Sequence, residues 1–152
     1  MIHNSRFCLV SGFLVLLLGC SGKPIPQFVV TEGTLMLDGK PLPLALVEFM
    51  PDVKNFGAEV NSTAVTDANG KFVMICGNTL GAMVATHRVV INEGPPPAGT
   101  RGQDAESQTK LAEYTSKLTN RPIPANYGNF SSTPLRVEIT AEKRDHILNM
   151  KK

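Results

Sequence analysis

The sequence contains no tryptophan, and aromatic residues make up only 6% of its 152 positions. A protein that binds carbohydrate is expected to expose aromatic rings, because their flat apolar faces and polar edges suit stacking at wet surfaces. The candidate rings here, those of Tyr114, Tyr127 and Phe130, all lie in or just after an irregular stretch of the chain. The composition therefore weakens a carbohydrate-binding function, without excluding it.

A strong charge of either sign is also lacking. Residues 20–152 carry 14 basic and 13 acidic side chains, a net charge of +1. Nucleic-acid binding calls for basic residues clustered on one surface. Basic residues gather only in the final stretch "EKRDHILNMKK", which a solvated terminus explains. Nucleic acid is therefore not an expected partner.

No apolar run reaches the roughly 20 residues that a membrane-spanning helix needs. The longest candidate, "FCLVSGFLVLLL", follows a short start with one arginine and no acid, which is typical of a secretory signal. It ends at Leu17-Leu18-Gly19-Cys20, which resembles the lipobox of bacterial lipoproteins, although Leu18 replaces the small residue common at that place. The resemblance implies a signal peptide over residues 1–19 and a diacylglycerol on the thiol of Cys20.

An anchor on Cys20 implies a place in the cell envelope. Each buried methylene contributes about 0.8 kcal/mol, and two or more acyl chains hold a protein at a bilayer where one does not. By the same resemblance, Ser21 favours the outer membrane over the inner one, with the face undetermined. Residues 20–27 would form a lipidated tether, and residues 28–152 a single domain.

A disulfide framework is excluded within the mature chain. Cys8 would leave with the signal and Cys20 would be acylated, so Cys76 has no partner. Cys76 stands in the apolar run "FVMICG", where a buried and unreactive thiol is the commoner case.

The body of the chain predicts β-structure, since short apolar stretches alternate with turn residues and no long helical period is present. Asp38-Gly39 predicts a hairpin between a strand ending at Leu37 and a strand from Leu44 to Met50. Asp67-Ala68-Asn69-Gly70 predicts a turn between strands 64–66 and 71–75. Further strands are expected at 83–92 and, as a final pair, at 134–140 and 146–150. We predict an all-β antiparallel sandwich of about seven strands.

Residues 93–124 depart from this pattern and read as an irregular insertion. "GPPPAGTRG" cannot pair as a strand, because proline lacks an amide donor. Leu111, Tyr114 and Leu118 fall at helical spacing behind Asp104, a candidate N-cap, so a short helix is an alternative to a long proline-rich loop. A loop of this length is either functional or mobile, and the lack of a convergent set of titratable groups favours a mobile one.

The stretches "GTLMLDGKPLPLALVEFMP", "TAVTDANGKFVM" and "HRVVI" follow one another along the chain. They resemble the carboxypeptidase regulatory-like family, which has a transthyretin-type (prealbumin-like) β-sandwich: the first is similar to its first hairpin and the second to its middle turn. The later "RPIPANYGNFSSTPLRVEIT" resembles the last strands of small planctomycete-type lipoproteins. The matching positions are Gly33, Gly39, Pro41, Leu42, Ala45, Val47, Thr66, Asp67, Gly70 and Phe72. Tight turns and core packing account for these positions without any site.

No catalytic, metal-binding or cofactor-binding set follows from the spacing. "TDANG" is similar to part of a calcium loop, but the further carboxylates and the distant glutamate are missing. His87 and Arg88 are neighbours on a strand and point to opposite faces, and His146 stands in the basic tail. The C-terminus "HILNMKK" also lacks the ending that the resemblance would require for a transthyretin-like hydrolase.

We therefore interpret the chain as a non-catalytic, lipid-anchored module of a bacterial envelope. Its expected partners are the membrane, through Cys20, and an envelope protein, a peptide or a glycan. A carbohydrate- or small-ligand-binding lipoprotein is the alternative. An enzyme would require a cleft that brings His87 together with acidic side chains from distant strands.

Overall fold

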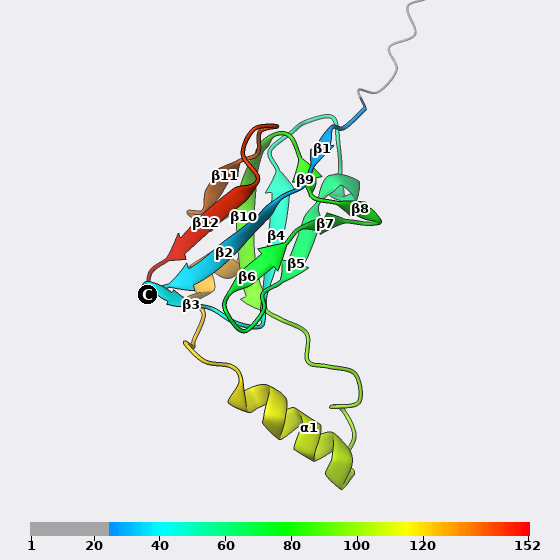
Figure 1. Ribbon diagram of the computed structural model, residues 1–152, viewed down its shortest axis with the longest axis vertical. Coiled ribbons are helices and arrows are strands. Elements are labelled where there is room, and N and C mark those ends of the chain that lie inside the picture. Colours follow the sequence, from blue (N-terminus) through cyan, green and yellow to red (C-terminus); the bar gives the residue numbers. More distant parts are fainter. Residues whose placement is uncertain (1–24) are drawn as a thin grey trace, which may run out of the picture.

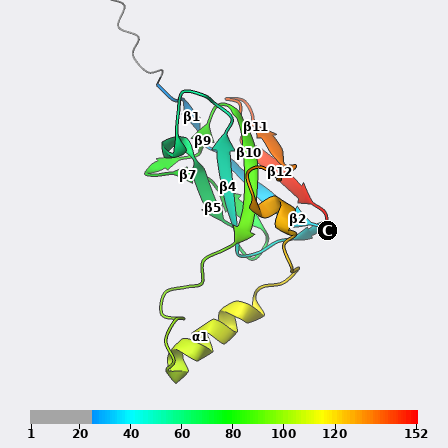
Figure 2. The same ribbon diagram turned by 180° about the vertical axis from the view of Figure 1, so that it is seen from behind.

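The computed structural model describes residues 25–152, and the predicted signal peptide, Cys20 and most of the predicted tether lie outside this range. Two main sheets face each other across a common core, and a single helix stands apart from them (Figures 1 and 2). The predicted all-β class with mostly antiparallel pairing is confirmed. Within the described residues no helix is both long and apolar enough to span a bilayer.

The larger sheet has the strand order β11-β10-β4-β5-β7-β8. Its centre is the antiparallel pairing of β4 with β10, which runs over seven residues of each strand. The strands are β4 (Ala45–Pro51), β5 (Ser62–Val65), β7 (Ile75–Cys76), β8 (Thr79–Leu80), β10 (Thr86–Glu93) and β11 (Arg136–Glu138).

The smaller main sheet is built around β2 (Glu32–Leu37). On one side β2 pairs with β12 (Asp145–Met150), and on the other with β3 (Lys40–Pro41) and β6 (Lys71–Val73). A separate short ladder joins β1 (Phe28–Val29) to β9 (Ala82–Met83). The twelve strands of the described chain exceed the seven expected, because several are only two residues long.

The remaining elements are short or stand outside the sheets. The helix α1 (Ala105–Ser116) lies in the proline-rich insertion, and two single-turn 3₁₀ helices, η1 (Ala58–Val60) and η2 (Ala125–Gly128), lie in connections. The predicted irregular character of residues 93–124 was therefore wrong for 105–116, where the helical alternative with Asp104 as N-cap is confirmed.

Both predicted turns are present. Asp67–Gly70 joins β5 of the larger sheet to β6 of the smaller one. Asp38 and Gly39 have φ of +52° and +74°, which suits a two-residue hairpin turn, yet the strand that this turn pairs with β2 is the two-residue β3. The chain then turns at Leu44, where φ is +53°, and β4 enters the larger sheet. The predicted pairing of 44–50 with the first strand was therefore wrong.

The predicted final pair was also wrong. β11 pairs with β10 in the larger sheet, whereas β12 crosses to the smaller sheet and pairs with β2 in parallel. Because β2 and β12 run parallel, the chain between them must cross over, and it completes this crossover when it passes from β11 in the larger sheet to β12 in the smaller one. This crossover buries His146, which is 2% exposed on β12, so its expected position in a solvated tail was wrong too.

The core is aliphatic, with two phenylalanine rings at its centre. Phe49 and Phe72 meet edge to face with ring centroids 6.0 Å apart, which joins the two sheets. Every second residue of β4 is buried, as expected for a strand with one face on a core. Fully buried side chains include Leu35, Leu37, Leu42, Val47, Phe49, Met74, Val89 and Ile91.

Candidate functional site

Exposed apolar side chains gather on the outer face of β5, β7 and β8 of the larger sheet and of the adjoining β6. Val65, Val73, Ile75 and Leu80 have exposed fractions of 45%, 45%, 46% and 52%, and we call these four residues the outer apolar patch. Thr63 is the direct partner of Ile75, and Ile75 of Leu80, so their side chains share one face of the sheet. Contiguous exposed apolar side chains of this kind mark interaction surfaces more often than isolated ones do.

The patch exists because the segment 72–76, which spans β6 and β7, has apolar side chains on both faces. Successive side chains of a strand point to opposite faces, so Phe72 and Met74 enter the core while Val73 and Ile75 point to solvent. On β5, Ser62 is buried and Val65 is exposed in the same alternation. Sequence reasoning missed the patch because "FVMIC" is apolar at every position and gives no sign of which face is covered.

The turn between β5 and β6 is fixed by Asp67. Its carboxylate Oδ1 accepts hydrogen bonds from the amides of Asn69 and Lys71, each at 2.8 Å. Gly70 adopts φ +73°, and a Cβ there would lie 2.5 Å from the carbonyl oxygen of Leu35. These contacts give "TDANG" a structural role as a tight turn.

Thr66 connects this turn to the neighbouring strand. Its hydroxyl donates to the carbonyl of Leu42 at 2.7 Å and accepts from the amide of Ala45 at 2.9 Å, while the side chain is buried. The start of β4 and the end of β5 are therefore held together from the inside.

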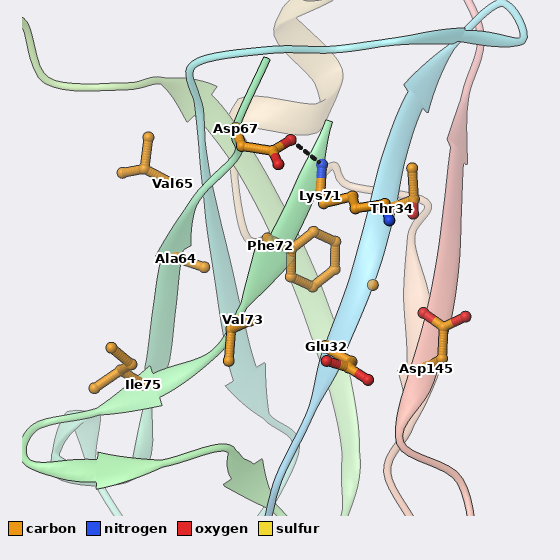
Figure 3. A pocket seen from close by; sticks show the side chains of 11 residues that line it. Glu32, Thr34, Ala64, Val65, Asp67, Lys71, Phe72, Val73, Ile75 and Asp145 are labelled. Atoms are coloured by element: carbon orange, nitrogen blue, oxygen red, sulfur yellow. Dashed lines mark hydrogen bonds between the residues drawn. The ribbon is translucent and has the colours of Figure 1, made fainter. Parts of the chain in front are cut away.

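Beyond the turn, β6 diverges from β5 and pairs with β2 instead. A groove lies between β5 and β6 as a result (Figure 3). The groove has a volume of about 790 Å³. We call it the β5–β6 groove. Ala64, Val65 and Ile75 line one side, Phe72 and Val73 lie in the middle, and Glu32 and Asp145 line the other side.

A glycine allows the close packing at the base of the groove. A Cβ on Gly33 would collide with the carbonyl of His146 and with the ring of Phe72. Gly33 therefore lets the ring of Phe72 lie against β2 while β12 approaches from the other side. This gives the first glycine of the family-like motif a packing reason.

The two acidic side chains on the far rim are neighbours in register. Asp145 of β12 pairs with Glu32 of β2, and both are exposed. Among residues 25–152, neither takes part in an ion pair. Lys71 is the one basic residue that lines the groove, and its side chain extends toward Thr34 in Figure 3.

The two histidines of the described residues, His87 and His146, are buried inside the sandwich. His87 is fully buried, its Nε2 lies 2.7 Å from the carbonyl of Met83, and its ring centroid is 5.7 Å from that of Phe49. Burial lowers the pKa of His87, opposed by the backbone carbonyls of Met83 and Phe49 and assisted by His146. Burial likewise lowers the pKa of His146, with a further contribution from Lys143. No carboxylate of the described chain hydrogen-bonds to His87.

Arg88 is on the opposite face, as predicted. Its guanidinium lies 4.5 Å from the ring centre of Phe130 and 3.8 Å from the carboxylate of Asp52. The three candidate aromatic rings are used structurally: Arg88 lies over Phe130, buried Tyr127 accepts from the amide of Lys151 at 3.0 Å, and Tyr114 donates to Gly94 at 2.7 Å.

The remaining candidates have structural settings. Cys76 is buried, as predicted, and its thiol lies 3.3 Å from the carbonyl of Glu59. Over residues 25–152, no three His, Cys, Asp or Glu side chains gather as a metal site would require. Cys20, the predicted lipidation residue, lies outside the described range.

Comparison with protein-family models found no match, and neither the search of curated proteins nor that of solved structures found one.

Proposed function

We propose that the protein is a lipid-anchored, non-catalytic β-sandwich of a bacterial cell envelope that binds another envelope protein through the outer apolar patch. The observation that carries the binding role is the patch itself: four aliphatic side chains, each about half exposed, lie on β5, β7 and β8 and on the adjoining β6. A partner that covered these side chains would gain about 25 cal/mol of binding free energy for each Å² of apolar surface removed from water.

The fold supports a carboxypeptidase regulatory-like, transthyretin-type identity within this proposal. Gly39 and Gly70 occupy turns with positive φ, and Leu42, Val47 and Phe72 lie in the core. Each has a structural role at the place where the family-like motif puts it.

The proposed anchor would hold the sandwich close to the bilayer. The eight residues 20–27 span at most about 28 Å when fully extended. In space, β1 and α1 lie at opposite ends of the described structure in both views (Figures 1 and 2). The anchored end would therefore face the membrane, and α1 would point away from it.

The anchor is tested by replacing Cys20 with serine. Labelled palmitate should enter the wild-type chain and not the Cys20→Ser variant, which should accumulate as an uncleaved precursor. Equal labelling of the two chains would refute the anchor.

The binding role is tested by purifying the full chain from detergent-solubilised membranes. A partner protein should copurify with the wild type and be lost with Val73→Asp, which places a charge in the patch. Ile147→Asp is the matched control, because Ile147 is also an exposed strand aliphatic, at 64%, but lies on β12. Identical copurification with both variants would contradict the proposal.

A further inference from the structure

Val65 and Val73 lie on the two strands that border the β5–β6 groove. The amide of Leu35 donates to Gly70 at 2.8 Å and the amide of Met74 donates to Thr31 at 2.9 Å. Backbone polar groups alternate in direction along a strand, so Lys71 and Val73 direct theirs away from β2. Lys71 is satisfied there, since its carbonyl accepts from the amide of Asp67 at 2.8 Å and its amide donates to the Asp67 carboxylate. Val73 lies opposite Glu32 and directs its own backbone groups toward β5.

The same reasoning applies to β5. The amide of Thr66 donates to Ala45 at 2.9 Å and its carbonyl accepts from Leu44 at 3.0 Å, so Thr66 directs its polar groups toward β4. Val65, one residue earlier, directs its own toward the groove. The strands are joined at Asp67 with Lys71 and again at Thr63 with Ile75, and Val65 and Val73 lie opposite each other between those points.

The groove therefore combines two features that a peptide segment can use. It offers aliphatic side chains on Val65, Val73 and Ile75, and two carboxylates on its far rim. Because successive side chains of an extended peptide point to opposite sides, every second side chain of the peptide can contact such a surface.

The charge of the rim selects among such peptides. Glu32 and Asp145 are adjacent in register, and like charges side by side are unfavourable unless a cation lies between them. Asp67 adds a third carboxylate, and Lys71 supplies a single positive charge. The lining is thus net negative and complementary to a basic side chain.

Resting on the proposed function, we propose that the β5–β6 groove binds an extended segment of the partner protein that presents aliphatic side chains and a lysine or arginine on the same side. The aliphatic side chains contact Val65, Val73 and Ile75, and the basic side chain reaches Glu32 and Asp145.

The experiment uses the detergent-solubilised full chain and a displayed library of random nine-residue peptides. Selected peptides should be rich in valine, isoleucine or leucine and should carry lysine or arginine. For a selected synthetic peptide, the double variant Glu32→Gln/Asp145→Asn should weaken binding about tenfold at low salt, and less at about 0.5 M salt, where charges are screened. Val73→Asp should also weaken binding. Glu106→Gln/Glu113→Gln on α1 is the matched control and should not.

Three outcomes overturn the inference: selected peptides that lack basic residues, binding unchanged in Glu32→Gln/Asp145→Asn, or failure to select any peptide while copurification still depends on Val73. The last outcome would mean that the partner presents a folded surface, and the proposed function would stand. Loss of the Val73 dependence in copurification would remove both.

Discussion

The sandwich and α1 are stabilised in different ways. In the sandwich, Leu35, Phe49 and Ile91 are fully buried between two sheets. In α1, a helix of twelve residues, only Ser107 is buried, and Leu111 is 37% exposed. The same chain therefore contains a region held by packing and a region held mainly by local polar contacts.

The local contacts of α1 are identifiable. Asp104 accepts from the amide of Ser107 at 2.9 Å and from its hydroxyl at 2.7 Å, which caps the first turn. Glu106 and Lys110 form an exposed ion pair, which contributes little. Isolated helices of this length are marginal in water. We therefore expect α1 to open at a much lower free energy than the sandwich.

The largest effect is expected from Phe49→Ala. Its ring contacts those of Phe72 and His87 across the core, and such truncations cost about 3–5 kcal/mol. The free energy of unfolding should fall by that amount in urea titrations. Leu111→Ala on α1 is the comparison, and a similar loss there would show that α1 packs as tightly as the sandwich.

The next largest effect is expected from acid, which should lower the stability of the sandwich at a higher pH than that of α1. The pKa values of His87 and His146 lie below their ordinary value of 6.5 in the folded chain, so the unfolded chain binds more protons. Stability is full above pH 6.5 and declines as the pH falls below it. The pKa of Asp104 is lowered from 3.8 by the hydroxyl and amide of Ser107, so the cap of α1 weakens only in stronger acid.

Thermal melting between pH 7.5 and pH 5 would measure this decline. His146→Asn should flatten the dependence, because it removes one of the two buried groups. A melting temperature that is constant over this range in the wild type would contradict the account.

A smaller, local effect is expected from Asp104→Ala. Loss of the cap should destabilise α1 by about 1 kcal/mol and speed amide exchange in residues 105–116. Exchange in β4 and β10 should not change. Faster exchange throughout both regions would show that they open together.

The smallest effect is expected from removing the insertion. Gly94 and Asn120 should be kept, because the amide of Gly94 donates to Leu44 and the side chain of Asn120 donates to Leu37. Replacing residues 95–119 with a short glycine-serine linker should leave cooperative melting of the sandwich intact. Loss of cooperativity would show that the insertion is part of the folding unit.

The sequence predicted local structure better than partnership between strands. Asp38-Gly39 and Asp67–Gly70 were recognisable because turns with positive φ favour those residues. Nothing local indicates that the chain changes sheet at Leu44, that β6 prefers β2 to β5, or that β12 runs parallel to β2. Those choices depend on packing between segments distant in the chain.

The candidate site was hidden for the same reason. Glu32 and Asp145 are more than a hundred positions apart in the sequence and become neighbours only through the crossover to β12. Val73 and Ile75 are predictable as strand residues, but their exposure depends on which face of the pair the core covers. His146 was misplaced because the charges around it obscured the alternating buried positions of β12.

The outer apolar patch is tested most directly by photo-crosslinking in intact cells. A photoreactive residue would be placed at Ile75 in the patch and, as the comparison, at the exposed Thr109 on α1. The account predicts one discrete adduct with a partner protein from position 75 and none from position 109. An adduct from position 109 alone would contradict it and would assign recognition to the helix.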